Sequence, residues 1–479
     1  MSDVSTVAPK GFFLNGKWHT QGPSTDIHSP YDQSVVGSVT LAGRRELEHA
    51  IEAAVEAFEI TRKMPSYQRQ AVLHKISTGI LNRKEEFARM MALEAGKPIR
   101  TARAEADRAI FTFQIAAEEA TRISGEYLPM DLQDFTVGRW GMVRRFPLGP
   151  IAAITPFNFP LNLVAHKVAP MIAAGCSMVL KPAPQAPITA LMLAEVVHEA
   201  GWPAGALNVL PLSNEDAEQM VTDDRLKMLT FTGSGKVGWQ LKAKSGKKKV
   251  VLELGGNAGV IIHSDSDIEY AAERCAVAGY SYAGQSCISV QRILVHRPAF
   301  DKFMEAFLSR VDKLKTGDPL HESTDVGPLI RQNDVTRAMQ WVEEAEKSGA
   351  RILRGGKAQG SVMEPTVLTN TKQNMRVNCE EVFAPVKTVE PYDDFDAAVR
   401  EINNTAYGLQ AGVFTRDAKL LFRAYEQLEV GGVIAGDVPT FRIDHMPYGG
   451  VKDSGLGREG LRYAIEEMTD PKLLVMNLR

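Results

Sequence analysis

The 479-residue chain contains only four cysteines, Cys176, Cys275, Cys287 and Cys379, and no two of them form a C-x-x-C pair. Four widely spaced cysteines exclude a disulfide framework and favour a reducing compartment, so we expect a cytoplasmic protein. The chain also has no H-E-x-x-H motif and no cluster of cysteine and histidine. We therefore expect no metal site.

Long hydrophobic runs and an excess of charge are absent as well. No segment reaches about 18 uninterrupted apolar residues, and the N-terminus lacks a basic stretch followed by an apolar core. The 55 basic and 58 acidic residues nearly cancel, to a net charge of −3. Such a balance excludes a general attraction to nucleic acid or to an anionic membrane, and we expect neither as a partner.

The pattern of apolar residues indicates an α/β fold. Between Arg45 and Gly125 apolar residues recur at helical spacing, as in Leu47, Ile51, Val55 and Phe58. From Gly149 onward, short β-branched runs alternate with helical ones, and a second alternating set follows Gly256. This alternation predicts βαβ units on parallel sheets, whose ligands bind beyond the carboxyl ends of the strands.

A glycine motif, "GSGKVG", places Gly233, Gly235 and Gly238 in the dinucleotide-binding pattern G-x-G-x-x-G, and Glu253 follows about twenty residues later. The match is weak evidence by itself, because "GLGREG" near the C-terminus has the same spacing without room for a βαβ unit. The Walker pattern is not met, since Val237 follows Lys236. The motif leaves two roles open for Glu253, which are ribose binding and chemistry.

Unusual polar residues gather at the predicted strand ends. Asn158 follows the strand "IAAIT", Lys181 ends "MVLK", Glu253 ends "VVLE", and Cys287 lies in a loop of small residues before "RILVH". Each of these residues has an ordinary explanation, such as a turn, a solvated head group or a small buried side chain. Their common position at strand-to-loop junctions indicates a functional site.

Seven ordered motifs resemble the aldehyde dehydrogenase superfamily, of the hydrolytic NAD(P)-dependent type. They are "TPFNFP", "LKPAPQAP", "FTGSGKVG", "LELGGN", "GQSC", "EEVFAPV" and "PYGGVKDSGLGREG". The resemblance implies a Rossmann-like cofactor domain, an α/β catalytic domain and a small β oligomerisation element. It implies these boundaries: 8–122 and 146–254 for the NAD(P)-binding domain, 255–449 for the catalytic domain, and 123–145 with 461–479 for the oligomerisation element.

The same resemblance implies a catalytic set of Cys287, Glu253 and Asn158. Cys287 would be the nucleophile that converts an aldehyde into a tetrahedral thiohemiacetal. Asn158 and the Cys287 backbone N–H would stabilise the alkoxide, and Glu253 would activate the water that hydrolyses the thioester. Glu253 is thus expected to do chemistry rather than bind ribose. Relatives that pass the acyl group to coenzyme A are expected to lack this glutamate, so we expect a free acid as product.

For the cofactor, the resemblance implies that Lys181 holds the adenosine ribose and that Gly233 and Ser234 hold the pyrophosphate. Glu381 would bind the nicotinamide ribose with Phe383 beside the ring, and Thr155, Phe157 and Leu254 would complete the cofactor site. NAD-preferring members commonly carry a glutamate where this chain has Pro184. We therefore expect NAD or NADP as cofactor, with NADP at least tolerated.

The substrate is expected to be a short polar aldehyde, because "GQSCISVQR" and "FRIDHMPYGG" resemble the branch acting on lactaldehyde. Succinic semialdehyde and glyceraldehyde 3-phosphate are the alternatives. Arginines or a histidine facing the entrance would favour anionic aldehydes, the candidates being Arg100, Arg103, Arg108, Arg442 and His445. A homodimer or homotetramer is expected. Two other classes stay open, a catalytically silent relative and a Rossmann reductase without a covalent intermediate.

Overall fold

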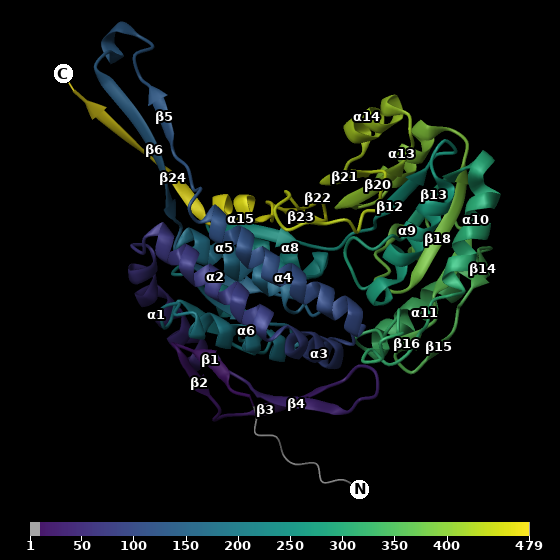
Figure 1. Ribbon diagram of the computed structural model, residues 1–479, viewed down its shortest axis with the longest axis horizontal. Coiled ribbons are helices and arrows are strands. Elements are labelled where there is room, and N and C mark those ends of the chain that lie inside the picture. Colours follow the sequence, from purple (N-terminus) through teal and green to yellow (C-terminus); the bar gives the residue numbers. More distant parts are fainter. Residues whose placement is uncertain (1–9, 479) are drawn as a thin grey trace.

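Four helices precede the main part of the first sheet in this computed structural model, which describes residues 10–478 (Figure 1). Leu47 and Ile51 are fully inaccessible to solvent, as the helical spacing predicts, whereas Val55, predicted on the same face of the first helix, is 37% exposed. The bounds are α1 (Arg44–Thr61), α2 (Ser66–Asn82), α3 (Lys84–Ala95) and α4 (Ile99–Glu119).

The first sheet has eight strands in the order β2-β1-β9-β8-β7-β10-β11-β23. The strands are β1 (Phe12–Leu14), β2 (Lys17–His19), β7 (Pro150–Ile154), β8 (Ser177–Lys181), β9 (Leu207–Val209), β10 (Met228–Thr232), β11 (Lys249–Glu253) and β23 (Gly455–Leu456). The helices between them are α5 (Asn162–Ala174), α6 (Pro187–Glu199), α7 (Glu218–Thr222) and α8 (Gly235–Lys244).

Five parallel strands of this sheet, β9-β8-β7-β10-β11, have the order 3-2-1-4-5 of a doubly wound fold. Alternate residues of β7 face opposite layers of helices. Ile151 packs in the core formed with α4, α5 and α6, whereas Ala152 packs in the core formed with α1 and α7. The chain order reverses between β7 and β10, which is where such sheets bind their ligands.

The second sheet has seven strands in the order β14-β17-β18-β13-β12-β20-β21. The strands are β12 (Gly259–Ile262), β13 (Arg292–His296), β14 (Arg351–Arg354), β17 (Thr366–Thr369), β18 (Val386–Tyr392), β20 (Gln410–Phe414) and β21 (Gly432–Ala435). Its helices are α9 (Ile268–Tyr280), α10 (Arg297–Val311), α11 (Gln332–Lys347), α12 (Arg376–Cys379), α13 (Phe395–Asn403) and α14 (Ala418–Gln427). Cys287 lies just before β13 and Glu381 just before β18, so the amino ends of this sheet face the site.

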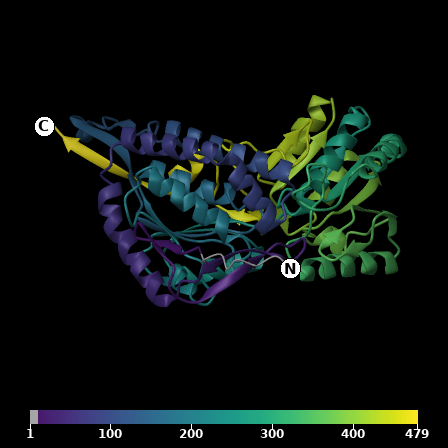
Figure 2. The same ribbon diagram turned by 60° about the horizontal axis from the view of Figure 1, so that its bottom comes forward.

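A three-stranded antiparallel sheet extends away from these two bodies at one end of the molecule (Figures 1 and 2). It consists of β5 (Glu126–Pro129), β6 (Arg139–Pro147) and β24 (Thr469–Asn477), in the order β24-β6-β5. The helix α15 (Leu461–Glu467) precedes β24 and packs instead against the core of the first sheet through Leu461 and Ile465.

The remaining elements are short. They are the 3₁₀ turns Asp134–Thr136 and Ser281–Gly284 and the strand pairs β3 (Ser24–His28) with β4 (Val35–Thr40), β15 (Ala358–Gln359) with β16 (Val362–Met363), and β19 (Tyr407–Gly408) with β22 (Val451–Lys452). The expected α/β fold class is confirmed by structural neighbours described below. The domain boundaries stay a prediction, and residues 8, 9 and 479 of those ranges lie outside the described residues.

Candidate active site

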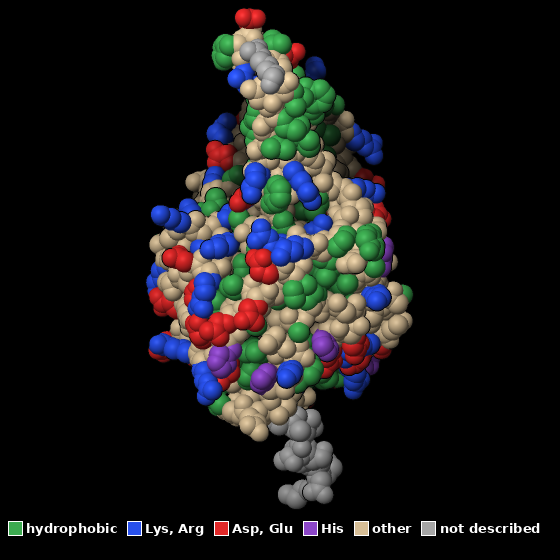
Figure 3. Space-filling view, turned by 90° about the vertical axis from the view of Figure 1, so that its left-hand side faces the viewer, with side chains coloured by type: hydrophobic (Ala, Val, Ile, Leu, Met, Phe, Trp, Pro, Cys, Tyr) green, Lys and Arg blue, Asp and Glu red, His purple; other side chains and the backbone are tan. Residues whose placement is uncertain are grey.

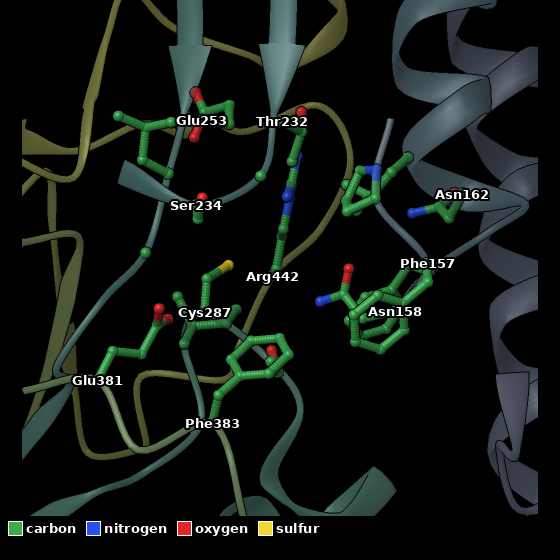
Figure 4. A pocket seen from close by; sticks show the side chains of 18 of the residues that line it. Phe157, Asn158, Asn162, Thr232, Ser234, Glu253, Cys287, Glu381, Phe383 and Arg442 are labelled. Carbon is green, nitrogen blue, oxygen red and sulfur yellow. The ribbon is translucent and has the colours of Figure 1, made fainter. Parts of the chain in front are cut away.

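A cavity of about 410 Å³ lies between the carboxyl ends of the first sheet and the amino ends of the second. Figure 4 shows Glu253, Arg442, Asn158 and Glu381 arranged around Cys287. Nine of the twelve residues predicted for the site line this cavity, namely Phe157, Asn158, Gly233, Ser234, Glu253, Leu254, Cys287, Glu381 and Phe383. Segments that are more than 200 residues apart in the sequence therefore meet at this cavity.

The other three predicted residues, Thr155, Lys181 and Pro184, lie outside the lining of this cavity, at the ends of neighbouring strands. The Thr155 backbone amide donates to the Lys181 carbonyl oxygen at 3.1 Å, which joins the ends of β7 and β8. The Lys181 side chain is buried and has no hydrogen-bond partner in the described part of the chain, and burial lowers its pKa to about 8. Pro184 is exposed beyond it.

Cys287 is partly accessible from the cavity. Burial raises the pKa of its thiol to about 12, and a hydrogen bond with the Tyr448 hydroxyl, at 3.0 Å from Sγ, acts in the opposite direction. Asn158 is buried, and its Nδ2 donates to the Gln285 backbone oxygen at 3.1 Å. An amide nitrogen carries two hydrogens, so this contact orients Asn158 and leaves one donor for an oxyanion.

Glu253 is buried at the end of β11, and neither of its carboxylate oxygens has a hydrogen-bond partner among the described residues. Burial, and then the negative charge of Glu459, raises the pKa of Glu253 well above its usual value. Burial alone would also raise the pKa of Glu459, but Lys167, His166 and Arg442 hold it below the usual value. Of these two carboxylates, Glu253 is the one whose raised pKa suits it to accept a proton and act as a base.

Two glycines of "LELGGN" allow the two halves of the site to approach. A Cβ on Gly256 would collide with the Cys287 carbonyl oxygen, and a Cβ on Gly255 would collide with the Glu381 carboxylate. The Gly256 amide donates to Glu381 Oε1 at 2.9 Å, while burial raises the pKa of Glu381 to about 7. These glycines are thus required for close approach rather than for an unusual backbone conformation.

The fingerprint glycines have related roles. A Cβ on Gly238 would collide with the Leu254 side chain, so this glycine lets α8 pack against the sheet. Helix α8 begins at Gly235, and the side chain of its N-cap residue Ser234 caps no backbone amide. The first-turn amides of α8 are therefore open toward the cavity edge, as pyrophosphate binding requires.

Arg108 and Arg442, two of the five residues predicted as substrate candidates, line the cavity wall. Arg108 Nη2 donates to Asp444 at 2.8 Å, and Arg442 Nη2 donates to Glu459 at 3.0 Å. The Nε atoms of both arginines are buried with no hydrogen-bond partner among the described residues. Arg100 and Arg103 instead pair with surface carboxylates, and His445 is exposed and does not line the cavity.

Sequence reasoning missed several residues of the site. Tyr448 contacts Cys287, and Lys167, His166 and Asp444 organise the charges behind Glu253 and Arg442. The motif "PYGGVKDSGLGREG" contains Tyr448 and Glu459 and could have directed attention to them. Within residues 10–478 no three His, Cys, Asp or Glu side chains are grouped to hold a metal, and no helix is long and apolar enough to span a membrane.

Comparison with known proteins places the chain in a family. The model of the aldehyde dehydrogenase family matches residues 18–474, so this chain belongs to that family. A 3-sulfolactaldehyde dehydrogenase of Priestia aryabhattai is 43% identical over 479 residues, covering 100% of both chains. A lactaldehyde dehydrogenase of Methanococcus aeolicus is 37% identical over 474 residues, covering 98% of this chain and 100% of the relative.

Solved structures similar to this chain are also aldehyde dehydrogenases. Aldehyde dehydrogenase 21 from Physcomitrella patens, in complex with its reaction product succinate, is 46% identical with a TM-score of 0.96, covering 98% of this chain and 99% of that one. Glyceraldehyde-3-phosphate dehydrogenase from Methanocaldococcus jannaschii, complexed with NADP, is 38% identical with a TM-score of 0.92, and the match covers 96% of this chain and 100% of that one.

These comparisons confirm the expected α/β fold, the resemblance to the family and its lactaldehyde branch, and the expectation of an aldehyde dehydrogenase. Structures of family members hold NADP or NAD⁺, in agreement with the expected cofactor. A family match over nearly the whole chain removes the alternative of an ordinary Rossmann reductase.

Proposed function

We propose that this protein oxidises a short aldehyde with an anionic group at its far end, and that it releases the free acid. The observation that carries this substrate class is the presence of two arginines, Arg108 and Arg442, in the cavity wall. A guanidinium binds a carboxylate, sulfonate or phosphate more strongly than a neutral hydroxyl, so two arginines in the wall favour an anionic group on the substrate. The two arginines therefore favour the anionic alternatives, among them succinic semialdehyde, over neutral lactaldehyde.

The two most informative relatives support the same class. One is named for 3-sulfolactaldehyde, which ends in a sulfonate, and the other was solved with succinate, which carries a second carboxylate. Both molecules are short, in keeping with a cavity of about 410 Å³ that also receives part of the cofactor.

In the proposed mechanism Cys287 Sγ attacks the aldehyde carbon, and the electron pair of the C=O bond moves to the oxygen. The free N–H of Asn158 and the Cys287 amide hold this alkoxide. When bound, NAD(P)⁺ supplies the acceptor for the hydride that leaves the reacting carbon. Glu253 then removes a proton from water, which attacks the resulting thioester and releases the acid and the Cys287 thiol.

The residues present fit the nicotinamide cofactor. The open first turn of α8 beside Gly233 and Ser234 would hold the pyrophosphate, and the unpartnered Lys181 ammonium would bind the adenosine ribose. Glu381 would bind the nicotinamide ribose next to Phe383, with Thr155, Phe157 and Leu254 around the cofactor. Phe383 has a backbone φ of 50°, an uncommon conformation for an aromatic residue. Its ring packs edge-on against the Phe157 ring, with 6.2 Å between the two ring centroids. Because exposed Pro184 carries no negative charge, we infer that NADP is accepted as well as NAD.

The experiment compares kcat/KM for succinic semialdehyde, 3-sulfolactaldehyde and lactaldehyde in the wild type, Arg108→Met and Arg442→Met. We expect the anionic aldehydes to lose at least tenfold in each variant and lactaldehyde to change less. Arg100→Met, which removes an ion pair with Asp325 and a 3.5 Å contact with the Thr324 carbonyl oxygen, is the matched control. A wild-type preference for lactaldehyde would contradict the anionic class, and no oxidation of any aldehyde would indicate a silent relative.

We also infer that the three-stranded sheet mediates assembly into a homodimer or homotetramer. Figure 3 shows hydrophobic side chains gathered on this extension. Exposed apolar residues on or beside its strands are Tyr127, Leu132, Phe135, Val137, Trp140, Met142, Leu473, Leu474 and Val475. A contiguous apolar patch marks an interaction surface. Sedimentation of the wild type and of Leu474→Glu would test this assignment.

The four unpaired cysteines agree with the proposed cytoplasmic location.

A further inference from the structure

Tyr448 lies directly against the proposed nucleophile. Its hydroxyl oxygen is 3.0 Å from Cys287 Sγ, and its side chain is 3% exposed. The Tyr448 backbone pairs with Glu459, because each residue donates its amide to the carbonyl of the other, at 3.0 and 2.6 Å. The ring packs with Ile288 and Leu409. Backbone and ring are therefore both fixed, so the position of the hydroxyl is determined before substrate binds.

Arg442 covers one face of the Tyr448 ring. Its guanidinium carbon lies 3.6 Å from the ring centroid, which is close for a cation–π contact. Glu459 Oε2 accepts from Arg442 Nη2 at 3.0 Å, and His166 Nδ1 is 2.8 Å from the same nitrogen. The guanidinium is therefore anchored, and it places a positive charge behind the phenol that contacts Cys287.

Either atom can donate while the thiol keeps its proton, but only the Tyr448 hydroxyl can donate to a Cys287 thiolate. Burial raises the pKa of Tyr448 well above 10, so its hydroxyl keeps its proton near neutral pH. It cannot act as the base that deprotonates the thiol, but it can donate a hydrogen bond. A donor at this position stabilises the thiolate more than the thiol and so lowers the pKa of Cys287, against the opposing effect of burial.

We propose that Tyr448 is a further catalytic residue, whose hydroxyl donates to Cys287 Sγ and stabilises the thiolate, and that Arg442 positions its ring. In this step the S–H bond breaks, the electron pair stays on sulfur, and the proton leaves to solvent. The phenol then donates to the sulfur until the sulfur bonds to the aldehyde carbon. The proposal rests on the proposed function in one respect, the assignment of Cys287 as nucleophile.

A competing explanation is that Tyr448 only fills space beside the substrate. The variant Tyr448→Phe distinguishes the two explanations, because it removes only the hydroxyl. It keeps the ring, its packing with Ile288 and Leu409, and its contact with Arg442. A space-filling role predicts no change in the reactivity of the thiol, whereas a hydrogen-bonding role predicts a loss.

The test measures alkylation of the full-length protein by iodoacetamide, without substrate or cofactor, at several values between pH 7 and pH 9.5. Mass spectrometry of the peptide containing Cys287 gives the rate at that residue. Below the thiol pKa this rate is proportional to the thiolate fraction. We expect Tyr448→Phe to slow alkylation about tenfold at each pH, equivalent to a rise of about one unit in the thiol pKa.

Two controls make the outcome specific. Cys379, which is partly exposed and is the last residue of the short helix α12, is an internal reference whose rate should not change. Tyr280→Phe removes another buried hydroxyl, one that donates to the Thr366 carbonyl oxygen at 3.0 Å, and should leave the Cys287 rate unchanged. An unchanged or faster Cys287 rate in Tyr448→Phe, with the Cys379 rate constant, would overturn the proposal.

A second measurement separates this proposal from the proposed function. Cys287→Ser should abolish aldehyde oxidation if Cys287 is the nucleophile. If the Ser variant stays fully active while Tyr448→Phe still slows alkylation, the mechanism fails but the hydrogen bond stands. If the Ser variant is inactive and Tyr448→Phe alkylates normally, the role of Tyr448 fails alone.

Discussion

The backbone amide of Gly256 donates a 2.9 Å hydrogen bond to Oε1 of Glu381, which ties the end of β11 to the loop before β18. The adjoining Gly255 leaves room for the same carboxylate, and Gly256 leaves room for the Cys287 carbonyl. One Gly-Gly pair thus sets the spacing between the first sheet and the two loops that carry Cys287 and Glu381.

Gly255→Ala should therefore impair cofactor binding. The new Cβ would displace the Glu381 carboxylate, so we expect the KM for the cofactor to rise at least tenfold. The matched control is Gly43→Ala, since a Cβ there would meet only the Glu46 side chain at 3.2 Å. Steady-state kinetics with varied cofactor measure the change, and an unaltered KM would show that the Glu381 position is not critical.

Glu253→Gln should separate the two halves of the reaction. An amide cannot take a proton from water, so we expect one equivalent of reduced cofactor per site and then a stalled thioester on Cys287. Stopped-flow absorbance would record the burst, and mass spectrometry would record the acyl adduct. Cys287→Ala should show neither, and Glu273→Gln on α9 should behave as the wild type. Normal turnover in Glu253→Gln would remove this residue from the mechanism.

The pH dependence of turnover should respond to Glu459. The Glu253 base works only when deprotonated, and its pKa is raised by burial and by the Glu459 charge, so thioester hydrolysis should increase as pH rises through that pKa. Glu459→Gln removes the neighbouring negative charge and lowers the Glu253 pKa, so the acidic limb of the kcat profile should move to lower pH. A limb that moves upward or stays in place would contradict the coupling of these two carboxylates.

Pro184→Glu should change the choice of cofactor. A carboxylate at this position, three residues after Lys181, would accept a hydrogen bond from the free 2′-hydroxyl of NAD and repel the 2′-phosphate of NADP. We expect the ratio of kcat/KM for NAD to that for NADP to rise at least tenfold. Pro184→Gln carries no charge and should produce a smaller shift. An NAD-only wild type would show that another residue selects the cofactor.

The sequence alone was sufficient to predict the fold class and to identify candidate residues for the chemistry. Alternating strand and helix patterns predict parallel sheets. Lys181 and Glu253 are the last residues of their strands and Asn158 follows a strand end by four residues, so local spacing is sufficient to place them. The family motifs then indicated a role for each residue. The prediction that Glu253 does chemistry rather than bind ribose came from this resemblance, because the glycine spacing by itself suits either role.

Tertiary structure decided which side chains contact one another across long separations. Tyr448 and Cys287 are 161 residues apart, and Arg108 and Asp444 are 336 apart, so no local pattern predicts either contact. Of five candidate residues for the substrate, only Arg108 and Arg442 line the cavity, because Arg100 and Arg103 lie on another face of α4 and pair with surface carboxylates. Burial, which sets the pKa values of Cys287 and Glu253, is likewise a property of the packed chain, because desolvation depends on every neighbour and not on the residue's own position in the sequence.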